Sequence, residues 1–494
     1  MSDAADRRPG LSMHVPIAWA LVPVLGVALL LRFVDLSRVP LIGDECYYWL
    51  WSRNLDWAYY DNPSGVAFLV RAGRALAGSG AWGIRWLNAL LGAGCVFLTY
   101  QVGQRLVSRR AGLWASATIA VAAPYLITSR FVYTDVLFLV LVLISILAFW
   151  RLATGSGGMD AGIALGVALA ALFNTKYSAY AFGAALILAV LIDHRHLVRT
   201  DSLWVGVLVG CLGLLPVLIW NGVHDWASFR WQFSHATRAI IGVPSLVGNA
   251  RHAWVYLTPP LCLIASLGLG RVRNPAERLL SLAALFQLVP VALSPANSPR
   301  NLTTGMVPLL ILAGTRLPPD LSGGHRRLLA GFLLVGLLAT GLYGVGTVAD
   351  LAAPSRLPSS SHVPEILHDA AGWPAIGRRI AEGTGPVFAI DYSVAAKVRY
   401  YAARPATTSW GQYRIWGIPD LDQVTVVALD YLPADWVTVQ LGEAFETLVG
   451  PECLSLAAPS SAKKVHIWQA KGLRLEEEQF LRQFDFLTLL EAAP

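Results

Sequence analysis

Charged side chains are scarce in this chain, and their scarcity argues against a soluble globular protein. Only 14% of the 494 residues are charged, whereas roughly 25% are charged in a typical soluble domain. The five cysteines show neither the paired spacing of a disulfide framework nor the spacing of metal ligands. No dinucleotide-binding or Walker phosphate loop is present, and no zinc-type cluster of His and Cys occurs. We therefore expect no cofactor and no metal site, although nothing excludes a divalent ion held by a single acid.

Long apolar stretches take the place of the missing charge. The hydrophobic fraction is 55% and the mean hydropathy is +0.53. A helix that crosses the hydrocarbon core needs about 20 apolar residues, so the stretches at 161–173 and 303–313 must borrow flanking residues. The pattern predicts a mainly α, polytopic membrane helix bundle of about eleven spans. They are centred on residues 15–31, 86–102, 112–127, 136–150, 161–173, 177–192, 203–220, 253–269, 279–293, 303–313 and 328–348.

Basic residues predict the orientation of these spans. Arginines recur on alternate sides of successive spans, beginning with Arg7 and Arg8, which favours a cytoplasmic N-terminus. No small-residue cleavage site follows the first span, so we expect a retained anchor rather than a cleaved signal. An odd number of spans then places the loop after the first span, and the C-terminal tail, on the side of the membrane opposite the cytoplasm.

Charge also divides the chain into two parts. Up to residue 349 there are 26 Lys and Arg against 14 Asp and Glu, and beyond it 12 against 17. The positive balance of the first part suits anionic lipid rather than nucleic acid. We predict a transmembrane domain at 1–349 and an α/β domain at 350–494 on the side of the membrane opposite the cytoplasm. In the tail, strands are expected at 387–390, 424–429, 436–439 and 465–469, and helices at 393–402 and 473–490.

The loop after the first span is rich in aromatic and acidic residues. Segments 45–56 and 64–76 are expected to form interfacial helices, because Trp and Tyr favour the headgroup region. An aromatic belt without a catalytic role would show the same pattern. Asp44 and Glu45 stand at the start of this loop, where charges beside a bilayer are costly unless they serve chemistry. They are candidates for a general base or for stabilising an electron-poor sugar carbon. A helix cap is the alternative.

Further polar residues are predicted to lie on the same side of the membrane. Asp61 lies in a turn of Asp, Asn, Pro, Ser and Gly, which also reads as turn chemistry alone. Asp135 begins the fourth span, where it could contact a polar ligand or merely cap the helix. Lys176, the sole lysine before residue 350, suits a phosphate group or could extend towards the interface. Further phosphate contacts are predicted for Arg130, Arg238 and Arg300.

Several of these short motifs resemble one family of membrane enzymes. Asp44-Glu45, Asp61-Asn62-Pro63, Thr134-Asp135 and Thr175-Lys176 are similar to landmarks of GT-C superfamily glycosyltransferases. The resemblance is narrower to the bacterial protein-mannosyltransferase-like branch, which includes lipid A aminoarabinose transferases and lipopolysaccharide galacturonic acid transferases. It extends to about Trp231, and the tail segment 391–416 shares it only loosely. The aminoarabinose branch has a Glu-Lys-Pro-Pro motif where this chain has Asp61-Asn62-Pro63-Ser64.

The resemblance implies a bacterial inner-membrane transferase that acts at the periplasmic surface. It would move a sugar from a polyprenyl-phosphate-linked donor to lipid A, lipopolysaccharide or another envelope acceptor. The family's catalytic aspartate corresponds to Asp44, its acid at the fourth span to Asp135, and its lysine to Lys176. Two alternatives stay open at this point. One is a transporter or flippase of lipid-linked sugars, and the other is an enzyme of the O-antigen ligase type.

Overall fold

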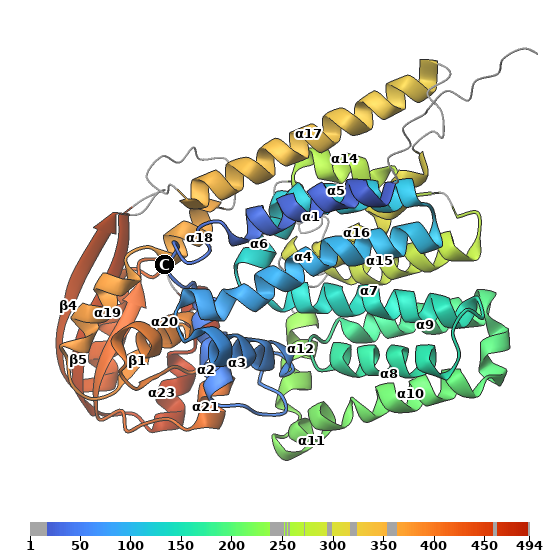
Figure 1. Ribbon diagram of the computed structural model, residues 1–494. Coiled ribbons are helices and arrows are strands. Elements are labelled where there is room, and N and C mark those ends of the chain that lie inside the picture. The colour runs from blue at the N-terminus through green and yellow to red at the C-terminus, as the bar shows by residue number, and fades with distance from the viewer. Residues whose placement is uncertain are drawn as a thin grey trace, which may run out of the picture.

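The computed structural model describes residues 17–237, 251, 254, 257–270, 272–293, 299–316, 324–352, 363–457 and 462–492. Long helices run side by side through one part of the molecule, and a small sheet with short helices lies beyond one end of them (Figure 1). The predicted fold class is therefore confirmed as a helix bundle with interfacial helices and a C-terminal α/β region. The helices of the bundle are α1 (Ile17–Phe33), α4 (Ala81–Leu106), α5 (Arg109–Val121), α6 (Ala123–Arg130), α7 (Thr134–Ala153), α8 (Met159–Phe173), α9 (Ala179–Asp193), α10 (Asp201–Leu212), α11 (Leu215–Val223), α12 (Ala227–Thr237), α14 (Pro259–Ser266), α15 (Pro275–Leu293), α16 (Leu302–Ala313) and α17 (Gly324–Ala352).

Each predicted span coincides at least in part with a helix, yet few helices are long enough to cross a bilayer alone. Within the described residues, four helices are long and apolar enough, or five if the bent pair α5 and α6 counts as one span. The 62° bend between that pair follows from Pro124, since proline cannot continue a helix as its interior residue. The protein is a multi-pass membrane protein, and the count of eleven spans stays a prediction. Part of the expected span at 253–269 lies outside the described residues.

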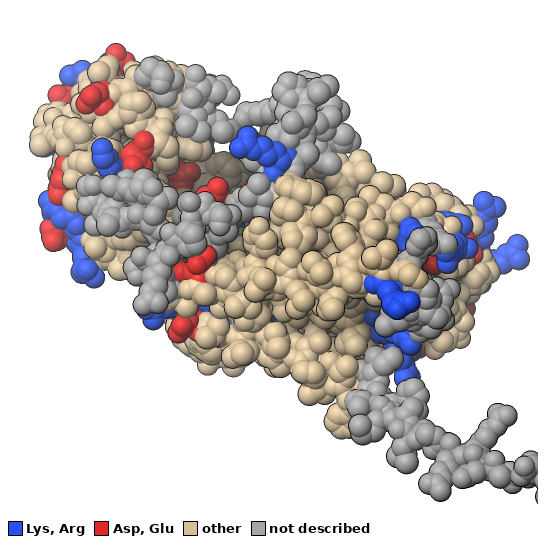
Figure 2. Space-filling view, turned by 90° about the horizontal axis from the view of Figure 1, so that it is seen from above, with Lys and Arg blue, Asp and Glu red and all other residues tan. Residues whose placement is uncertain are grey.

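The surface agrees with a membrane setting. In the face shown in Figure 2, charged side chains gather towards the two ends of the molecule, and the surface between them is almost uncharged. Many large apolar side chains on the bundle helices are exposed, among them Leu208 and Ile219. An apolar patch of this extent would be unusual on a soluble monomer. It is expected where lipid tails cover the protein.

The first loop forms the two predicted interfacial helices, α2 (Gly43–Arg53) and α3 (Gly65–Ala77). Almost all of α2 is buried, including Trp49 and Trp51, because the C-terminal region packs directly onto it. A Cβ atom on Gly43 would lie 2.4 Å from Cβ of Ser393, so only glycine allows this close approach. The first loop and the tail thus share one hydrophobic core, which contains Tyr47, Trp373 and Tyr413.

The C-terminal region is built around a five-stranded mixed sheet of order β2-β1-β3-β5-β4. Strands β1 (Val387–Ala389), β2 (Ala406–Thr407) and β3 (Gln423–Leu429) are parallel, whereas β4 (Phe445–Ala457) and β5 (Ala462–Leu473) pair antiparallel. Three predicted strands coincide with β1, β3 and β5. The remaining helical elements are α18 (Val363–Ala370), α19 (Trp373–Ala381), α20 (Tyr392–Lys397), a π-helical turn (Val398–Ala402), α21 (Gly411–Trp416), α22 (Ala434–Ala444), α23 (Glu477–Gln483) and α24 (Phe486–Ala492).

Two predictions in the tail are wrong. The strand expected at 436–439 lies inside α22, where Val437 and Leu441 are buried against the sheet on one helix face. The single helix expected at 473–490 is instead the end of β5 followed by the separate helices α23 and α24.

Candidate active site

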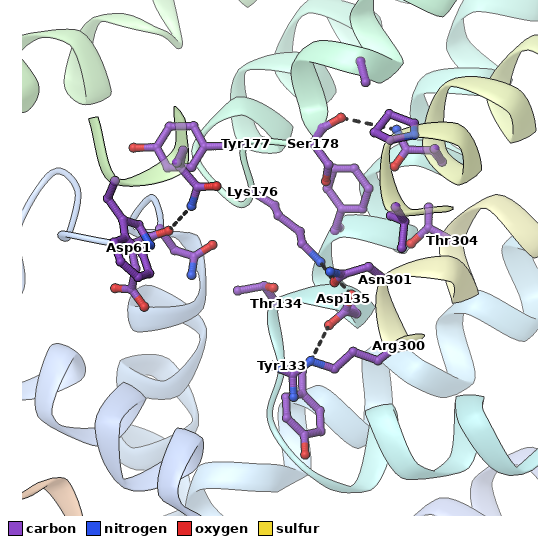
Figure 3. A pocket seen from close by; sticks show the side chains of 18 of the residues that line it. Asp61, Tyr133, Thr134, Asp135, Lys176, Tyr177, Ser178, Arg300, Asn301 and Thr304 are labelled. Atoms are coloured by element: carbon purple, nitrogen blue, oxygen red, sulfur yellow. Dashed lines mark hydrogen bonds and ion pairs between the residues drawn. The ribbon is translucent and has the colours of Figure 1, made fainter. Parts of the chain in front are cut away.

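A cavity of about 460 Å³ lies where the bundle, the first loop and the C-terminal region meet. It is lined by residues of the first loop, of α7, α12, α15 and α16, of the segments before α9 and α16, and of the C-terminal region (Figure 3). The lining residues are Tyr48, Asp61, Asn62, Tyr133, Thr134, Asp135, Phe138, Lys176, Tyr177, Ser178, Ala181, Trp231, Gln232, Phe286, Gln287, Pro290, Val291, Arg300, Asn301, Thr304, Tyr392 and Trp410. Four predicted carboxylates or cations, Asp61, Asp135, Lys176 and Arg300, thus line one cavity.

Acids and cations alternate across this cavity. Nζ of Lys176 lies 2.8 Å from Oδ1 of Asp135, and Oδ2 of Asp135 lies 4.0 Å from Nε of Arg300. Arg300 also places Nη1 3.3 Å from Oδ2 of Asp44. One series of ion pairs therefore connects residues that are more than 250 positions apart in the sequence. The positive members are held by carboxylates but remain partly exposed, at 16% for Lys176 and 31% for Arg300.

Helix ends position these charges. Asp135 stands in the first turn of α7, where a negative charge is favoured by the helix dipole. Lys176 follows the end of α8 and also donates to Oδ1 of Asn301, at 2.6 Å. Arg300 belongs to the short 3₁₀ turn Pro299–Asn301 ahead of α16, and its guanidinium lies over the ring of Tyr133 at 4.2 Å. Chain reversals at one end of the bundle thus bring the charges together.

Asp44, in the first turn of α2, is not itself a lining residue of the cavity, but it contacts Arg300 and Tyr392, which are. Its Oδ1 accepts a hydrogen bond of 2.9 Å from the hydroxyl of Tyr392, in the C-terminal region. Its carboxylate is 18% exposed, so it stays accessible to a small reactant. Both the bundle and the tail therefore orient Asp44.

Asp61 lies at another part of the cavity wall, in the turn before α3. The turn is fixed against the bundle because the Gly65 amide donates to the carbonyl of Asn174 at 2.6 Å. Oδ1 of Asp61 accepts from the Tyr47 hydroxyl at 3.3 Å, and its carbonyl accepts from Nε2 of Gln232 at 2.6 Å. Burial raises the pKa of Asp61 to about 7, because the charged carboxylate loses hydration.

This shifted pKa predicts a pH dependence of stability. The folded state keeps the Asp61 proton up to about pH 7, whereas an unfolded chain releases it near pH 3.9. The contribution of this group to the free energy of unfolding is therefore fully present below about pH 4 and is lost as the pH rises to about 7. In thermal unfolding of the purified protein, we expect Asp61→Asn to match the wild type at the acid end and to be more stable at about pH 8. Equal melting temperatures at both ends would contradict the shift.

Glu45 does not reach the cavity, and its partners, unlike those of Asp44, are not among the lining residues. Its side chain is fully buried and forms a two-pronged ion pair with Arg85, with distances of 2.7 and 2.6 Å. The same carboxylate accepts from the backbone amides of Ile42 and Val132 at 3.2 and 3.0 Å. Its oxygens are thus engaged by the protein, and the geometry favours a structural role over the catalytic one predicted for it.

The other two predicted arginines do not add to the described lining of the cavity. Arg130 ends α6 with its side chain buried, and Nη1 donates to the carbonyl of Leu31 at 2.8 Å. It belongs to the packing of α6 against α1 rather than to the described lining. Arg238 lies outside the described residues.

Sequence reasoning did not select several lining residues as site residues. Tyr392 and Trp410 come from the tail, and Asn301 and Tyr133 bind or cover the predicted cations. Only the loose family resemblance of segment 391–416 hinted at the first two. In the part of the chain that is described, no group of three or more His, Cys, Asp or Glu side chains is placed to hold a metal ion.

The arrangement suits chemistry on a phosphate ester of a lipid. Cations that are fixed before the reaction can stabilise charge on a leaving phosphate. A carboxylate within reach can accept a proton from a hydroxyl group. The carboxylates Asp44 and Asp135 balance the charges of Lys176 and Arg300.

Part of the chain matches the model of a glycosyltransferase family. Residues 61–220 match the family model of dolichyl-phosphate-mannose-protein mannosyltransferases. The predicted resemblance to GT-C glycosyltransferases of the lipid A-modifying type is confirmed by this match and by the relatives that follow.

One sequence relative and two solved structures are similar to this chain. The lipid A galacturonosyltransferase RgtD of Rhizobium johnstonii is 34% identical over 218 residues, which cover 42% of this chain and 46% of RgtD. The chain thus aligns with about half the length of this curated relative. Among solved structures, ArnT from Cupriavidus metallidurans bound to undecaprenyl phosphate has a TM-score of 0.61 at 18% identity, covering 92% of this chain and 98% of ArnT. The archaeal oligosaccharyltransferase AglB from Archaeoglobus fulgidus has a TM-score of 0.52 at 11% identity, covering 83% and 69%. These structural matches establish a common fold.

Proposed function

We propose that this protein is a glycosyltransferase of the bacterial inner membrane. It moves a sugar from a polyprenyl-phosphate-linked donor to lipid A or another envelope glycolipid, with its active site facing the periplasm. The observation that carries the proposal is the alternating ion-paired set Asp44, Arg300, Asp135 and Lys176, of which the last three line one cavity at the end of a membrane bundle. The similarity to RgtD and the fold shared with ArnT support the same activity.

In this proposal the cationic side chains bind the sugar donor. Lys176 and Arg300 bind the carrier phosphate, since they are the lining Lys and Arg residues of the described cavity. An acceptor oxygen attacks the anomeric carbon, the bond from that carbon to the phosphate oxygen breaks, and the polyprenyl phosphate leaves with the electron pair. Attack opposite to the leaving group inverts the anomeric configuration. The two side chains stabilise the charge on the phosphate.

The carboxylates serve the acceptor and the sugar. Asp44 takes the proton when the acceptor is a hydroxyl group. When the acceptor is a phosphate, as one on lipid A would be, no base is needed, and Asp44 acts through orientation and charge. Asp135 holds the two cations in place, and Asp61 orients a substrate hydroxyl group.

In this proposal the two parts of the chain have different roles. Residues 1–349 supply the charged cavity, and residues 350–494 cover the first loop and contribute Tyr392 beside Asp44. Transport or flipping of a lipid-linked sugar is not favoured, because the acids gather at one end of the bundle rather than along a path through it. The ligase alternative is not favoured either, because such an enzyme would carry its decisive residues in a large later loop, whereas Asp44 and Asp61 belong to the first loop.

Reconstituted protein tests this function directly. Proteoliposomes with a polyprenyl-phosphate-linked galacturonic acid donor and lipid A should yield lipid A that is heavier by one sugar, with one lipid phosphate released for each product. Mass spectrometry measures both products. Absence of any transfer with this donor, and with donors that carry other sugars, would contradict the proposed activity.

Lys176→Met is expected to weaken binding of the carrier phosphate. A hydrogen bond to a charged group contributes about 1.5–3 kcal/mol, which corresponds to a roughly ten- to hundredfold loss of affinity for undecaprenyl phosphate. Lys176→Arg keeps the charge and should lose less. Calorimetry or thermophoresis on the purified variants in detergent measures the effect, and unchanged affinity in folded Lys176→Met would remove Lys176 from the phosphate site.

A further inference from the structure

Two tryptophans form part of the cavity wall near Asp61. Trp231 comes from α12, and Trp410 comes from the loop before α21. Their ring centroids lie 4.7 Å apart with the planes at 74°. Tyr60 of the first loop lies against both rings, at 5.5 Å from each. Three segments that are far apart in the sequence thus build one aromatic surface.

Contacts on the protein side hold this surface in place. Nε1 of Trp410 donates to the Tyr47 hydroxyl at 3.2 Å, and its ring stacks on Tyr392 with centroids 5.0 Å apart. The backbone amide of Tyr60 donates to Oε1 of Gln412 at 2.7 Å. A rigid aromatic wall loses little conformational freedom when a ligand binds to it.

The two tryptophans of the cavity wall are more exposed than the tryptophans of the core. Trp51, Trp373 and Trp468 are fully buried, whereas Trp231 and Trp410 are part-exposed and line the cavity. A large ring that meets a cavity offers apolar contact area of defined shape. Packing within the protein does not by itself require such a ring to line a cavity.

Polar groups lie at the edge of the aromatic surface. Gln232 follows Trp231 in α12 and lines the cavity beside Asp61 and Asn62. One face of a pyranose ring presents C–H groups, and its edge carries hydroxyl groups. An aromatic wall bordered by amides and a carboxylate matches both features, since pockets combine apolar area with a few placed polar groups.

We propose that Trp231 and Trp410 form a stacking subsite for a pyranose ring, with Asp61, Asn62 and Gln232 binding its hydroxyl groups. The subsite rests on the proposed function, because it identifies where a sugar lies in the same cavity. The pyranose belongs either to the donor or to the glycolipid acceptor, which share this ring chemistry. The C-terminal region is then part of the sugar site, not only a cover.

Trp231 is the better position for a test, because Trp410 also contacts Tyr392 next to Asp44. Trp231→Leu removes the aromatic face, whereas Trp231→Phe keeps a smaller one. Full-length purified variants in detergent would be titrated with undecaprenyl phosphate, undecaprenyl-phosphate galacturonic acid and lipid A. We expect Trp231→Leu to bind undecaprenyl phosphate like the wild type and to lose roughly five- to tenfold affinity for one sugar-bearing ligand. Trp231→Phe should lose less, and the affected ligand identifies the source of the ring.

The outcomes separate this subsite from the proposed function. Unchanged affinity of Trp231→Leu for both sugar-bearing ligands, or an equal loss for undecaprenyl phosphate, overturns the subsite. So does an equal loss in Trp231→Leu and Trp231→Phe, or a wild type that binds neither sugar-bearing ligand. Tryptophan-dependent binding of lipid A without any sugar transfer would instead uphold the subsite and refute the transferase.

Discussion

Asp44→Asn is expected to lower the rate of sugar transfer by roughly a hundred- to ten-thousandfold, the range that a positioned proton acceptor contributes. Asparagine has nearly the same shape, and its side-chain oxygen can still accept from the Tyr392 hydroxyl, which now lies 2.9 Å from Oδ1. The negative charge opposite Arg300 is lost, but Arg300 keeps Asp135 as a neighbour. The variant should therefore fold and still bind the lipid phosphate while the chemical step fails.

The measurement is the initial rate of transfer in proteoliposomes, together with the affinity for undecaprenyl phosphate. Asp56→Asn is the matched control, because Asp56 lies in the same loop but binds Nε1 of Trp220 and is not part of the ion-paired set Asp44, Arg300, Asp135 and Lys176. It should keep a rate close to that of the wild type, because Asp56 is not part of the set that is proposed to contact the substrates.

The acceptor decides how far the rate falls in Asp44→Asn. With a hydroxyl acceptor the full loss is expected, because a proton must be removed. With a phosphate acceptor the loss should be smaller, since Asp44 then contributes only charge and orientation. A folded Asp44→Asn variant with the wild-type rate on both kinds of acceptor would refute a catalytic role for Asp44.

Much of the bundle could be predicted from the sequence because lipid imposes a simple rule on apolar helices. The first interfacial helices also followed from local composition. The strand predicted at 436–439 failed because Val and Trp suit both a strand and the buried face of a helix, and a four-residue window does not distinguish them. There, packing of α22 against the sheet decided the outcome.

The site was predictable where the chemistry is local and not where it depends on distant partners. Asp44, Asp135 and Lys176 stand at ends of apolar stretches, where charge is conspicuous. Tyr392 and Trp410 join the cavity only because the tail folds back onto the first loop, across more than 300 positions. Asp44 and Glu45 are adjacent and chemically alike, and only their partners in the structure separate their roles: Glu45 pairs with buried Arg85, whereas Asp44 pairs with Arg300.

Glu45→Gln is expected to destabilise the protein rather than to block its chemistry. Glu45 and Arg85 are 0% and 1% exposed, and Arg85 additionally donates to the carbonyls of Leu36, Val39 and Pro40 at 2.9, 2.7 and 3.0 Å. Removing one partner of such a pair leaves a buried charge uncompensated, at a cost of about 3–5 kcal/mol. The melting temperature of the purified variant in detergent should fall strongly, while the transfer rate per folded molecule stays near that of the wild type.

A double variant shows whether the lost stability comes from the unpaired charge. Glu45→Leu combined with Arg85→Met removes both charges and keeps apolar volume, and such replacements are often close to neutral. We therefore expect the double variant to melt above Glu45→Gln, although the carbonyls that Arg85 binds lose their donor. A Glu45→Gln variant that melts like the wild type yet loses transfer as Asp44→Asn does would reverse the assignment. Glu45 would then be the catalytic carboxylate, and the pair with Arg85 would have to open during the reaction.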